Sequence, residues 1–393
     1  MNSRIFKAPL LVAAGLLLIF GQGLASEQIV NCDEGDSLQK AIDSGAGSAA
    51  EKEIYVTGYC EENVRILRDK VTLIGDGNTV INGRILVRGS DNLTIENMKI
   101  TGQRGGISAS VSRIFMENVN IEDNSGYGIA LRHGGAIFMT GGSIKNNLGD
   151  IGLLVENGHG QLTDVEVSNN AVDGIVVNVN GNLTMSGGSV QSHGMGNGII
   201  AKLGSTLELV DVTVKENLYA GVSILMGSAA EIQGGFVETN EGIGIDVADN
   251  SSLAAYGVEI KDNGSTGVRA YRSSNVNIVG GMINGNARVI PNRSGVFVST
   301  SSSADIDSTE ISGNGTGVGI SRQSFVLLRG ATVVTYNSRD GMRLSYDSGA
   351  IALNGVYIRD NSGWAVYCND TESSLDNRSG DNVDPIECSG FDQ

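Results

Sequence analysis

Proline is nearly absent from this chain, which holds 3 prolines among its 393 residues. Aromatic residues are also scarce at 5%, so a core would have to be built mainly from Val, Ile, Leu and Ala. Basic residues number 27 against 44 acidic ones, and the net charge of −17 argues against nucleic acid as a partner. The scarcity of proline excludes collagen and proline-rich disorder. Glycine is in excess, with 56 residues that follow no strict three-residue period.

Long apolar runs are absent except near the N-terminus. Arg4 and Lys7 precede the apolar run 10–20, and small residues follow it up to Ser26. A basic start, a short apolar run and small residues are typical of a secretory signal peptide, and the run is too short to span a bilayer comfortably. The alternative is a membrane anchor. We expect residues 1–26 to be a signal peptide and the mature protein to be periplasmic or secreted, without stable membrane insertion.

Cysteine is limited to four residues, two near each end of the mature chain. Three pairings are open, and the local one joins Cys32 to Cys60 and Cys368 to Cys388. In an oxidising compartment, closed loops of this size would stabilise each end by about 3 kcal/mol. The chain has no CxxC motif and only 3 His, so no metal can be assigned from its cysteines and histidines.

The sequence repeats itself about every 23 residues. Anchor asparagines recur at steps of 23 or 24 residues, with one step of 28, and His193 occupies the same phase between Asn170 and Asn217. Length alone would predict two or three domains, but a fixed period over some 300 residues predicts one solenoid. The anchors are Asn124, Asn147, Asn170, Asn217, Asn240, Asn263, Asn286, Asn314, Asn337 and Asn361.

The local pattern within each repeat distinguishes between kinds of solenoid. Apolar and polar residues alternate, as in 136–139 and 189–192, which indicates strands, and no repeat has the apolar stripe of a helix. The LxxLxL core of leucine-rich repeats is absent as well. Three short strands per repeat predict a parallel β-helix in which each strand bonds to its counterpart one coil away, about 4.8 Å distant. The asparagines would form a ladder along the axis, and His193 is interpreted as a corner residue of that ladder.

The motif Asn-x(3–5)-Gly-[Ile/Val]-x-[Val/Leu/Ala] resembles the β-helix repeats of the pectin lyase-like superfamily. Residues 36–42 resemble the amphipathic helix that caps the open end in that family, with Asp36 or Ser37 as N-cap, and 54–58 and 71–75 resemble its first coils. The resemblance implies an all-β, single-stranded, right-handed parallel β-helix of about 14 coils. Activity stays open, because the fold hosts lyases, hydrolases, epimerases, adhesins and inert scaffolds.

The resemblance and the cysteines together predict the organisation of the chain. After the signal peptide, we assign 27–60 to an N-terminal cap with a short helix, 61–367 to the β-helix, and 368–393 to a C-terminal cap closed by a disulfide. Stapled ends discourage end-to-end stacking of open coils, so we expect a monomer.

Catalytic motifs are mostly missing. Relatives that hydrolyse polygalacturonate carry an NTD, a paired Asp, a Gly-His-Gly and an Arg-x-Lys in that order. Only Gly158-His159-Gly160 matches, without the paired Asp upstream or the Arg-x-Lys downstream, and we interpret it as accidental. No GxSxG elbow occurs, and no pair of glycosidase-type carboxylates can be assigned.

Charge is distributed unevenly along the repeats. Residues 116–262 carry 5 basic and 18 acidic side chains, whereas 269–343 carry 8 arginines against 4 acidic residues. Alternation after the periodic glycine points one set of these side chains outward, and counterparts on adjacent coils lie about 5 Å apart. We therefore predict one strip along the solenoid. Its members are Asp246, Arg269, Tyr271 and Phe297, with Lys202 before them and Arg343 beyond.

The one long repeat lies beside this strip. The step from Asn286 to Asn314 includes Arg288 and Arg293, about five residues more than the usual turn. Insertions in solenoids map to loops on one face, often the binding face. Arginine forks suit carboxylate or sulfate, and an aromatic ring suits a sugar face, so the strip predicts binding of an acidic glycan. The alternative is that these arginines only offset acidic neighbours on a solvated surface.

Two functions follow. The first is an exported protein that binds an acidic polysaccharide and processes it as a lyase, epimerase or glycoside hydrolase of the pectin lyase-like type. The second is a non-catalytic envelope or cell-surface scaffold that adheres to glycan or protein. For the first, catalysis would fall to Arg269, Tyr271 and Lys202, and substrate binding to Asp246, Phe297, Arg288, Arg293 and Arg343. Asp246 with Asp249 would hold Ca²⁺ or tune the catalytic groups, and no other cofactor is expected.

Overall fold

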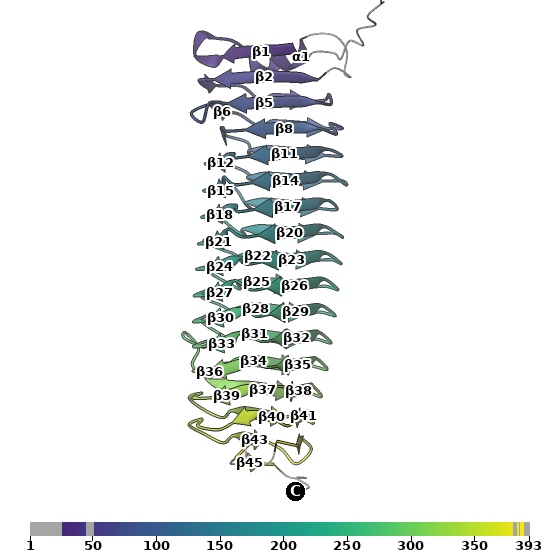
Figure 1. Ribbon diagram of the computed structural model, residues 1–393, viewed down its shortest axis with the longest axis vertical. Helices are drawn as coiled ribbons and strands as arrows, with labels where there is room; N and C mark the ends of the chain where they lie inside the picture. The colour runs from purple at the N-terminus through teal and green to yellow at the C-terminus, as the bar shows by residue number, and fades with distance from the viewer. Residues whose placement is uncertain (1–25, 45–50, 380–382, 385, 389–393) are drawn as a thin grey trace, which may run out of the picture.

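The computed structural model describes residues 26–44, 51–379, 383–384 and 386–388, and shows a column of stacked coils (Figure 1). Each coil contributes one strand to each of three parallel sheets, A, B and C, which hold 16, 14 and 15 strands. Strands of one sheet pair only with their counterparts in neighbouring coils, so the chain passes from sheet A to B to C and back to A. The predicted all-β, right-handed parallel β-helix is confirmed, with about 15 turns.

The strands keep their sheet and length from coil to coil. Sheet A consists of β1 (Ser26–Asn31), β2 (Lys52–Thr57), β5 (Val71–Gly75), β8 (Leu93–Glu96), β11 (Arg113–Glu117), β14 (Ala136–Thr140), β17 (His159–Thr163), β20 (Asn182–Ser186), β23 (Thr206–Val210), β26 (Ala229–Gln233), β29 (Ser252–Tyr256), β32 (Asn275–Val279), β35 (Ser303–Asp307), β38 (Phe325–Arg329), β41 (Gly349–Ala352) and β44 (Ser374–Asn377). Sheet B consists of β3 (Tyr59–Cys60), β6 (Val80–Asn82), β9 (Lys99–Thr101), β12 (Asn120–Glu122), β15 (Ser143–Lys145), β18 (Glu166–Ser168), β21 (Ser189–Gln191), β24 (Thr213–Lys215), β27 (Phe236–Glu238), β30 (Glu259–Lys261), β33 (Met282–Asn284), β36 (Glu310–Ser312), β39 (Val333–Thr335) and β42 (Tyr357–Ile358). Sheet C consists of β4 (Val64–Ile66), β7 (Ile85–Arg88), β10 (Ile107–Ser110), β13 (Ile129–Arg132), β16 (Leu153–Glu156), β19 (Ile175–Asn178), β22 (Ile199–Lys202), β25 (Val222–Ile224), β28 (Ile245–Ala248), β31 (Val268–Tyr271), β34 (Ser294–Ser299), β37 (Thr316–Ser321), β40 (Met342–Ser345), β43 (Val366–Cys368) and β45 (Ile386–Glu387).

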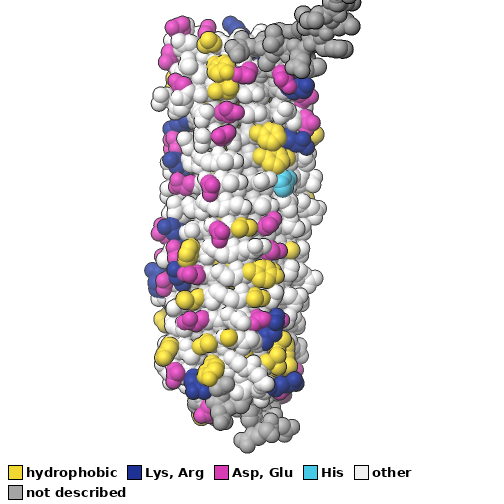
Figure 2. All heavy atoms as spheres, viewed as in Figure 1, with side chains coloured by type: hydrophobic (Ala, Val, Ile, Leu, Met, Phe, Trp, Pro, Cys, Tyr) yellow, Lys and Arg dark blue, Asp and Glu magenta, His cyan; other side chains and the backbone are white. Residues whose placement is uncertain are grey.

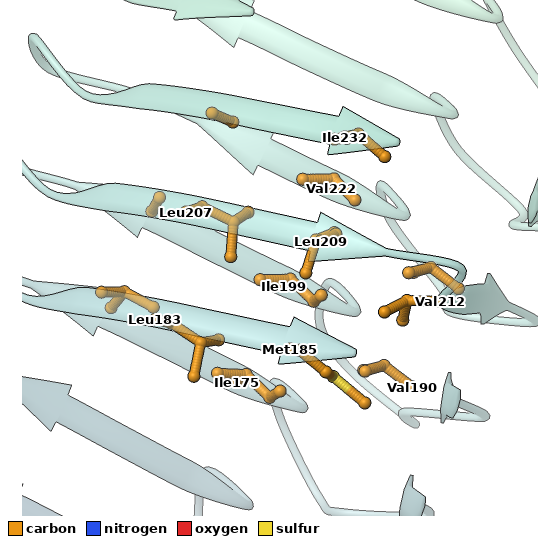
Figure 3. Close-up of a cluster of buried hydrophobic side chains, with 14 of the residues drawn as sticks. Ile175, Leu183, Met185, Val190, Ile199, Leu207, Leu209, Val212, Val222 and Ile232 are labelled. Carbon is orange, nitrogen blue, oxygen red and sulfur yellow. The ribbon is translucent and has the colours of Figure 1, made fainter. Parts of the chain in front are cut away.

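The core is the space that the three sheets enclose. Alternation along each strand sends every second side chain inward, and like residues stack on like from one coil to the next. In Figure 3, Leu183 and Met185 of β20 meet Ile175 of β19 and Val190 of β21, and all four are fully buried. Burying such a side chain contributes about 1.5–3 kcal/mol, so the repeat itself supplies the stability of the column.

The N-terminal end is closed by a six-residue helix, α1 (Leu38–Asp43), which follows a 3-10 turn, η1 (Cys32–Glu34). Of the two N-caps that we considered, Ser37 takes the position, and its side chain accepts a hydrogen bond from the amide of Lys40. Leu38, Ala41 and Ile42 are buried over the first coil. The parallel ladder of sheet A begins at β1, so no break in the sheet separates this cap from the coils.

Both predicted disulfides form. Cys32 is joined to Cys60, and Cys368 is joined to Cys388, at sequence separations of 28 and 20. The local pairing is thus confirmed, and it fits an oxidising compartment. The predicted signal peptide falls almost entirely outside the described residues. Within the described part of the chain, no helix has the length and apolar character to cross a bilayer.

The anchor asparagines line up as one buried ladder at the corner between sheets B and C. The Asn217 amide donates to Oδ1 of Asn240 at 2.8 Å, and Asn240 donates to Asn263 at 2.9 Å. His193 occupies one position of this ladder, where its Nδ1 accepts a hydrogen bond from the backbone amide of Asn170 at 3.1 Å. Burial lowers the pKa of His193 from 6.5 to about 4, so the ring is neutral at pH 7. Its position is therefore structural.

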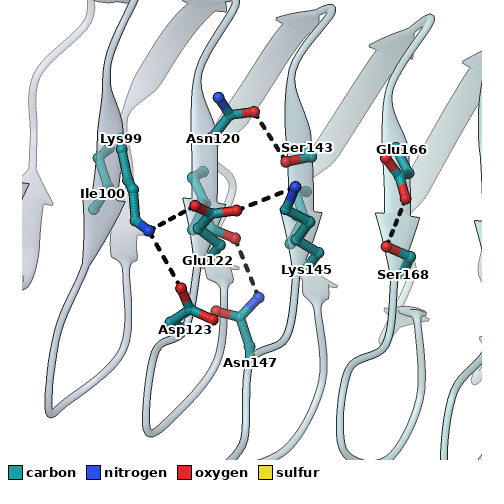
Figure 4. A network of polar contacts seen from close by, with 12 residues as sticks. Lys99, Ile100, Asn120, Glu122, Asp123, Ser143, Lys145, Asn147, Glu166 and Ser168 are labelled. Atoms are coloured by element: carbon teal, nitrogen blue, oxygen red, sulfur yellow. Dashed lines mark hydrogen bonds and ion pairs between the residues drawn. The ribbon is translucent and has the colours of Figure 1, made fainter. Parts of the chain in front are cut away.

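On the outer face of sheet B, acidic and basic side chains of adjacent coils form ion pairs. Glu122 of β12 lies between Lys99 and Lys145, with its carboxylate oxygens 2.6 Å and 3.3 Å from their Nζ atoms (Figure 4). The hydrogen bond to Glu122 raises the pKa of Lys99 above its ordinary value. Each exposed pair contributes about 0–1 kcal/mol, but such pairs align opposite charges on adjacent coils.

Candidate functional site on sheet C

The outer face of sheet C changes character along the column. In register on successive strands lie Leu154, Val176 and Ile200, which form a small apolar cluster of their own. The next strand, β25, presents Ser223 in this position, and the row then becomes charged. The candidate site begins where this apolar row ends.

Asp246 of β28, Arg269 of β31 and Phe297 of β34 are in register on three consecutive strands. The next strand presents Gly319, and a Cβ there would lie 2.9 Å from the Phe297 ring. The Phe297 ring therefore extends over the Gly319 backbone. Arg343 follows on β40, one strand further on.

Arg269 and Asp246 form the best-defined contact of the row. Nε and Nη2 of Arg269 donate to Oδ1 and Oδ2 of Asp246, both at 2.7 Å. The Asp246 side chain is 13% exposed and that of Arg269 is 36% exposed, so the carboxylate is the more buried of the two groups. An arginine has about five N–H donors, and this pair uses two of them. The remaining donors are available to an anion.

Tyr271 lies two residues after Arg269, toward the corner between sheets C and A. Its ring centroid is 5.7 Å from the guanidinium carbon of Arg269 and 4.6 Å from that of Arg272. Arg272 is in turn paired with Asp249 at 3.1 Å, and this hydrogen bond raises the pKa of Arg272 above its ordinary value. Tyr271 is thus flanked by two cations on the outer surface.

The insertion forms an ordered loop at the N-terminal ends of the sheet C strands, opposite to Tyr271. The amides of Val289 and Ile290 donate to the carbonyl of Gly264, at 2.8 and 2.9 Å, and the carbonyl of Arg293 accepts from Thr316. The Arg288 guanidinium is paired with Glu241 at 3.2 Å. The Arg293 side chain is exposed immediately before β34. Arginines therefore lie at both the N-terminal and the C-terminal ends of the sheet C strands in these coils.

The structure does not bring Lys202 to this group. We expected Lys202 to precede Asp246 in one outward row, but Ile200 is the residue of β22 that continues this row, through Ser223. Lys202 stands in the row of Tyr271, three strands away, which corresponds to about 14 Å at the strand spacing of a sheet. Two-residue alternation placed both on the outer face, yet it could not tell the two outward rows apart.

Arg343 likewise makes contacts of its own. It donates to Asp340 at 3.2 Å and to Asn369 at 3.3 Å, and it lies 4.9 Å from the centroid of Tyr367. Five of the eight arginines between 269 and 343 are in ion pairs. The positive charge of residues 269–343 is therefore largely neutralised, and these arginines act as oriented donors more than as free charge.

Metal and histidine chemistry receive little support. Among the residues that the structure describes, no group of three or more His, Cys, Asp or Glu could hold a metal ion. Asp246 and Asp249, the pair considered for Ca²⁺, each face a guanidinium. His159 lies on the outer face of β17, with Nδ1 2.8 Å from Asn182 and its ring against Phe138.

Sequence reasoning missed a depression on sheet A. It measures about 530 Å³ and opens on the outer faces of β29, β32, β35 and β38. Among its lining residues are Asn277, Asp305, Phe325 and Arg329. On the side of the column that faces the viewer in Figure 2, acidic and basic side chains are interspersed. Periodicity alone does not indicate this depression, because its lining residues come from four different coils.

Comparisons with known proteins concern the fold. A family model described as "Right handed beta helix region" matches residues 73–206 and 190–333. The A-module of mannuronan C-5 epimerase AlgE4 from Azotobacter vinelandii has a similar structure, at 16% identity over 88% of this chain and 99% of that chain, with a TM-score of 0.56. The AlgE6 A-module from the same organism is similar at 15% identity over 87% and 99% of the two chains, with a TM-score of 0.48. No curated protein matches the sequence.

Proposed function

Since the chain belongs to the family of right-handed β-helix proteins, we propose that it is an exported member that binds an acidic polysaccharide across the outer face of sheet C. The observation that carries the proposal is the two-bond pair of Arg269 with Asp246, beside Tyr271 and next to the one inserted loop. Export is supported by the basic and apolar start of the sequence and by the two disulfides.

The arrangement suits a polyanion with sugar rings. Asp246 fixes the plane of the Arg269 guanidinium, so little conformational freedom is lost when a carboxylate binds its outer donors. Tyr271 and Phe297 flank this guanidinium on the same face and offer ring surfaces to a sugar. Arg288 and Arg293 on the insertion extend the basic surface to the other edge of the sheet. A polysaccharide that crosses sheet C would thus contact cationic side chains and aromatic rings in alternation.

The similar A-module belongs to a mannuronan C-5 epimerase, so the same fold serves polysaccharide chemistry in that protein. For this chain we propose Tyr271 as the group to exchange a proton with a bound uronate, because it is the one hydroxyl-bearing ring beside Arg269. Arg269 would orient the sugar carboxylate. Lys202, three strands away, would contact a different part of the polymer.

A second candidate function is binding without processing, as an envelope or cell-surface scaffold. The pairing of Arg269, Arg272 and Arg343 with acidic neighbours favours it, since none of these guanidiniums is left as an isolated charge. The two candidates differ in one assay. Processing predicts that a uronate polymer gains unsaturated ends or changes its C-5 configuration, with loss of this activity in Tyr271→Phe. Scaffold function predicts binding without either change.

Binding itself is tested by calorimetric titration of hexagalacturonate. We expect Arg269→Ala to weaken binding by about tenfold or more, because a charged hydrogen bond is worth about 1.5–3 kcal/mol. Arg113→Ala is the matched control, since Arg113 is an exposed arginine on sheet A with an acidic neighbour 4.0 Å away. Equal affinity of both variants would refute the proposed site.

A further inference from the structure

The depression on sheet A is built like a binding site and lies on a different face from the candidate site. Four consecutive strands, β29 to β38, contribute its walls. Its volume of about 530 Å³ lies within the range of ligand sites, about 300–1,000 Å³. It is open along one side, which suits a polymer that passes over the surface better than an enclosed small molecule.

One aromatic ring forms its apolar wall. Phe325 is the first residue of β38, and its side chain is 40% exposed. In the next strand its register partner is Gly349, and a Cβ there would lie 3.3 Å from the ring. The glycine lets the Phe325 ring lie close to the backbone of the next coil, with its other face toward the depression.

The polar wall mixes donors and acceptors. Oδ1 of Asn277 is buried and accepts no hydrogen bond from the described residues, although the side chain lines the depression. Arg329 donates through Nε to Asp305 at 2.7 Å and through Nη1 to Asp307 at 2.5 Å, which leaves Nη2 free of these two bonds. Asn275 accepts from Ser303 at 2.6 Å and keeps its amide donors. The amide donors of Asn275 and Nη2 of Arg329, together with the carboxylate oxygens of Asp305, would complement hydroxyl groups, which both donate and accept.

Charge distinguishes this surface from sheet C. Arg329 is shared by two carboxylates, Asp305 and Asp307, so the group carries one net negative charge. A uronate would be repelled here, whereas the hydroxyls of an uncharged sugar would find partners without that penalty. The ligand is therefore expected to be neutral.

We propose that the sheet A depression binds pyranose rings of a neutral polysaccharide, with Phe325 against a ring face and Asn277, Asp305 and Arg329 hydrogen-bonded to its hydroxyls. This site is independent of the acidic-glycan site on sheet C. A protein with both would hold two kinds of glycan on two faces of one column and so connect them.

The test is calorimetric titration of the full mature chain with four neutral hexasaccharides, namely cellohexaose, maltohexaose, xylohexaose and mannohexaose. We expect at least one to bind, and Phe325→Ala to weaken that binding by about tenfold. Asn277→Ala should weaken it as well. Phe236→Ala is the matched control, because Phe236 is 38% exposed on sheet B, and it should bind like the wild type.

Thermal unfolding of each variant is the control for retention of the fold. Binding of none of the four sugars, or equal binding by Phe325→Ala and the wild type, would overturn the proposal. A loss of hexagalacturonate binding in Phe325→Ala would overturn the neutral assignment. Arg269→Ala should leave neutral-sugar binding intact, so this result is separable from the fate of the proposed function.

Discussion

Asp246 and Arg269 are joined across two adjacent strands of sheet C by two hydrogen bonds of 2.7 Å each. The carboxylate is the more buried partner, so it holds the guanidinium in one plane and turns its unused donors outward. The pair therefore has two opposing effects on an anionic ligand. Asp246 orients the cation, and its own charge also reduces the attraction.

Replacing Asp246 separates these effects. In Asp246→Asn, Arg269 keeps a hydrogen-bonding neighbour while one negative charge is removed, so we expect hexagalacturonate to bind severalfold more tightly than to the wild type. The measurement is the dissociation constant at low and high salt, and the gain should shrink as salt rises. Asp376→Asn is the control, because Asp376 of β44 pairs with Arg378 near the C-terminal end of the column, far from sheet C residue Arg269. A weaker affinity in Asp246→Asn would mean that the carboxylate itself contacts the ligand.

The asparagine ladder predicts a large loss of stability from one substitution. Asn240→Ala removes the acceptor of both the side-chain and the backbone amide of Asn217, so that the buried backbone amide of Asn217 loses its partner. It also removes the side-chain donor to Asn263, whose Oδ1 keeps only the backbone amide of residue 240. We expect the free energy of unfolding to fall by about 2–5 kcal/mol in denaturant titrations. Asn292→Ala, in the exposed insertion, should change it by less than about 0.5 kcal/mol. Equal effects would contradict the ladder as a source of stability.

His193 gives the ladder a pH dependence. Its pKa is about 4 in the folded protein and 6.5 in the unfolded chain, so the unfolded state binds the proton more tightly between these values. Stability is fully present above pH 6.5 and is lost as the pH falls toward 4, by about 3 kcal/mol in total. His193→Asn should remove this part of the loss, measured as unfolding free energy at pH 7 and pH 4.5. His133→Asn, at an exposed corner, should leave it in place.

Each disulfide should stabilise only the end of the column that it closes, so that removing one disulfide destabilises that end first. Replacing Cys32 and Cys60 by Ser removes a link of 28 residues at the helix-capped end, and we expect a loss of about 3 kcal/mol. Hydrogen exchange should then increase first in β1 and β2. An increase confined to the C-terminal coils would contradict this assignment, and the Cys368 and Cys388 double replacement provides that comparison.

The fold was predictable because its cause is periodic. Asn217, Asn240 and Asn263 recur at a fixed step since each must bond to the next, and a single sequence displays that constraint. The alignment of Asp246 with Arg269 also follows from the step of 23 residues. Surface contacts are not periodic in this sense. Lys202 was placed in the wrong row, and the pairing of Arg329 with two aspartates became visible only once adjacent outward side chains were in position.

The candidate site could be predicted only to the level of a face. Alternation shows that Phe297 points outward but does not show that its ring lies against Gly319, because that neighbour is 22 residues away on another coil. Likewise, the inserted loop was expected beside the strip, while the bonds that fix Val289 and Ile290 to Gly264 required the folded chain.

The central claim is that sheet C binds an acidic polysaccharide through Arg269. A crystal structure with bound hexagalacturonate tests it most directly. The account predicts a uronate carboxylate within hydrogen-bond distance of the Arg269 guanidinium, with sugar rings against Tyr271 or Phe297. A uronate seated on sheet A or sheet B, with Arg269 in contact with Asp246 alone, would contradict it.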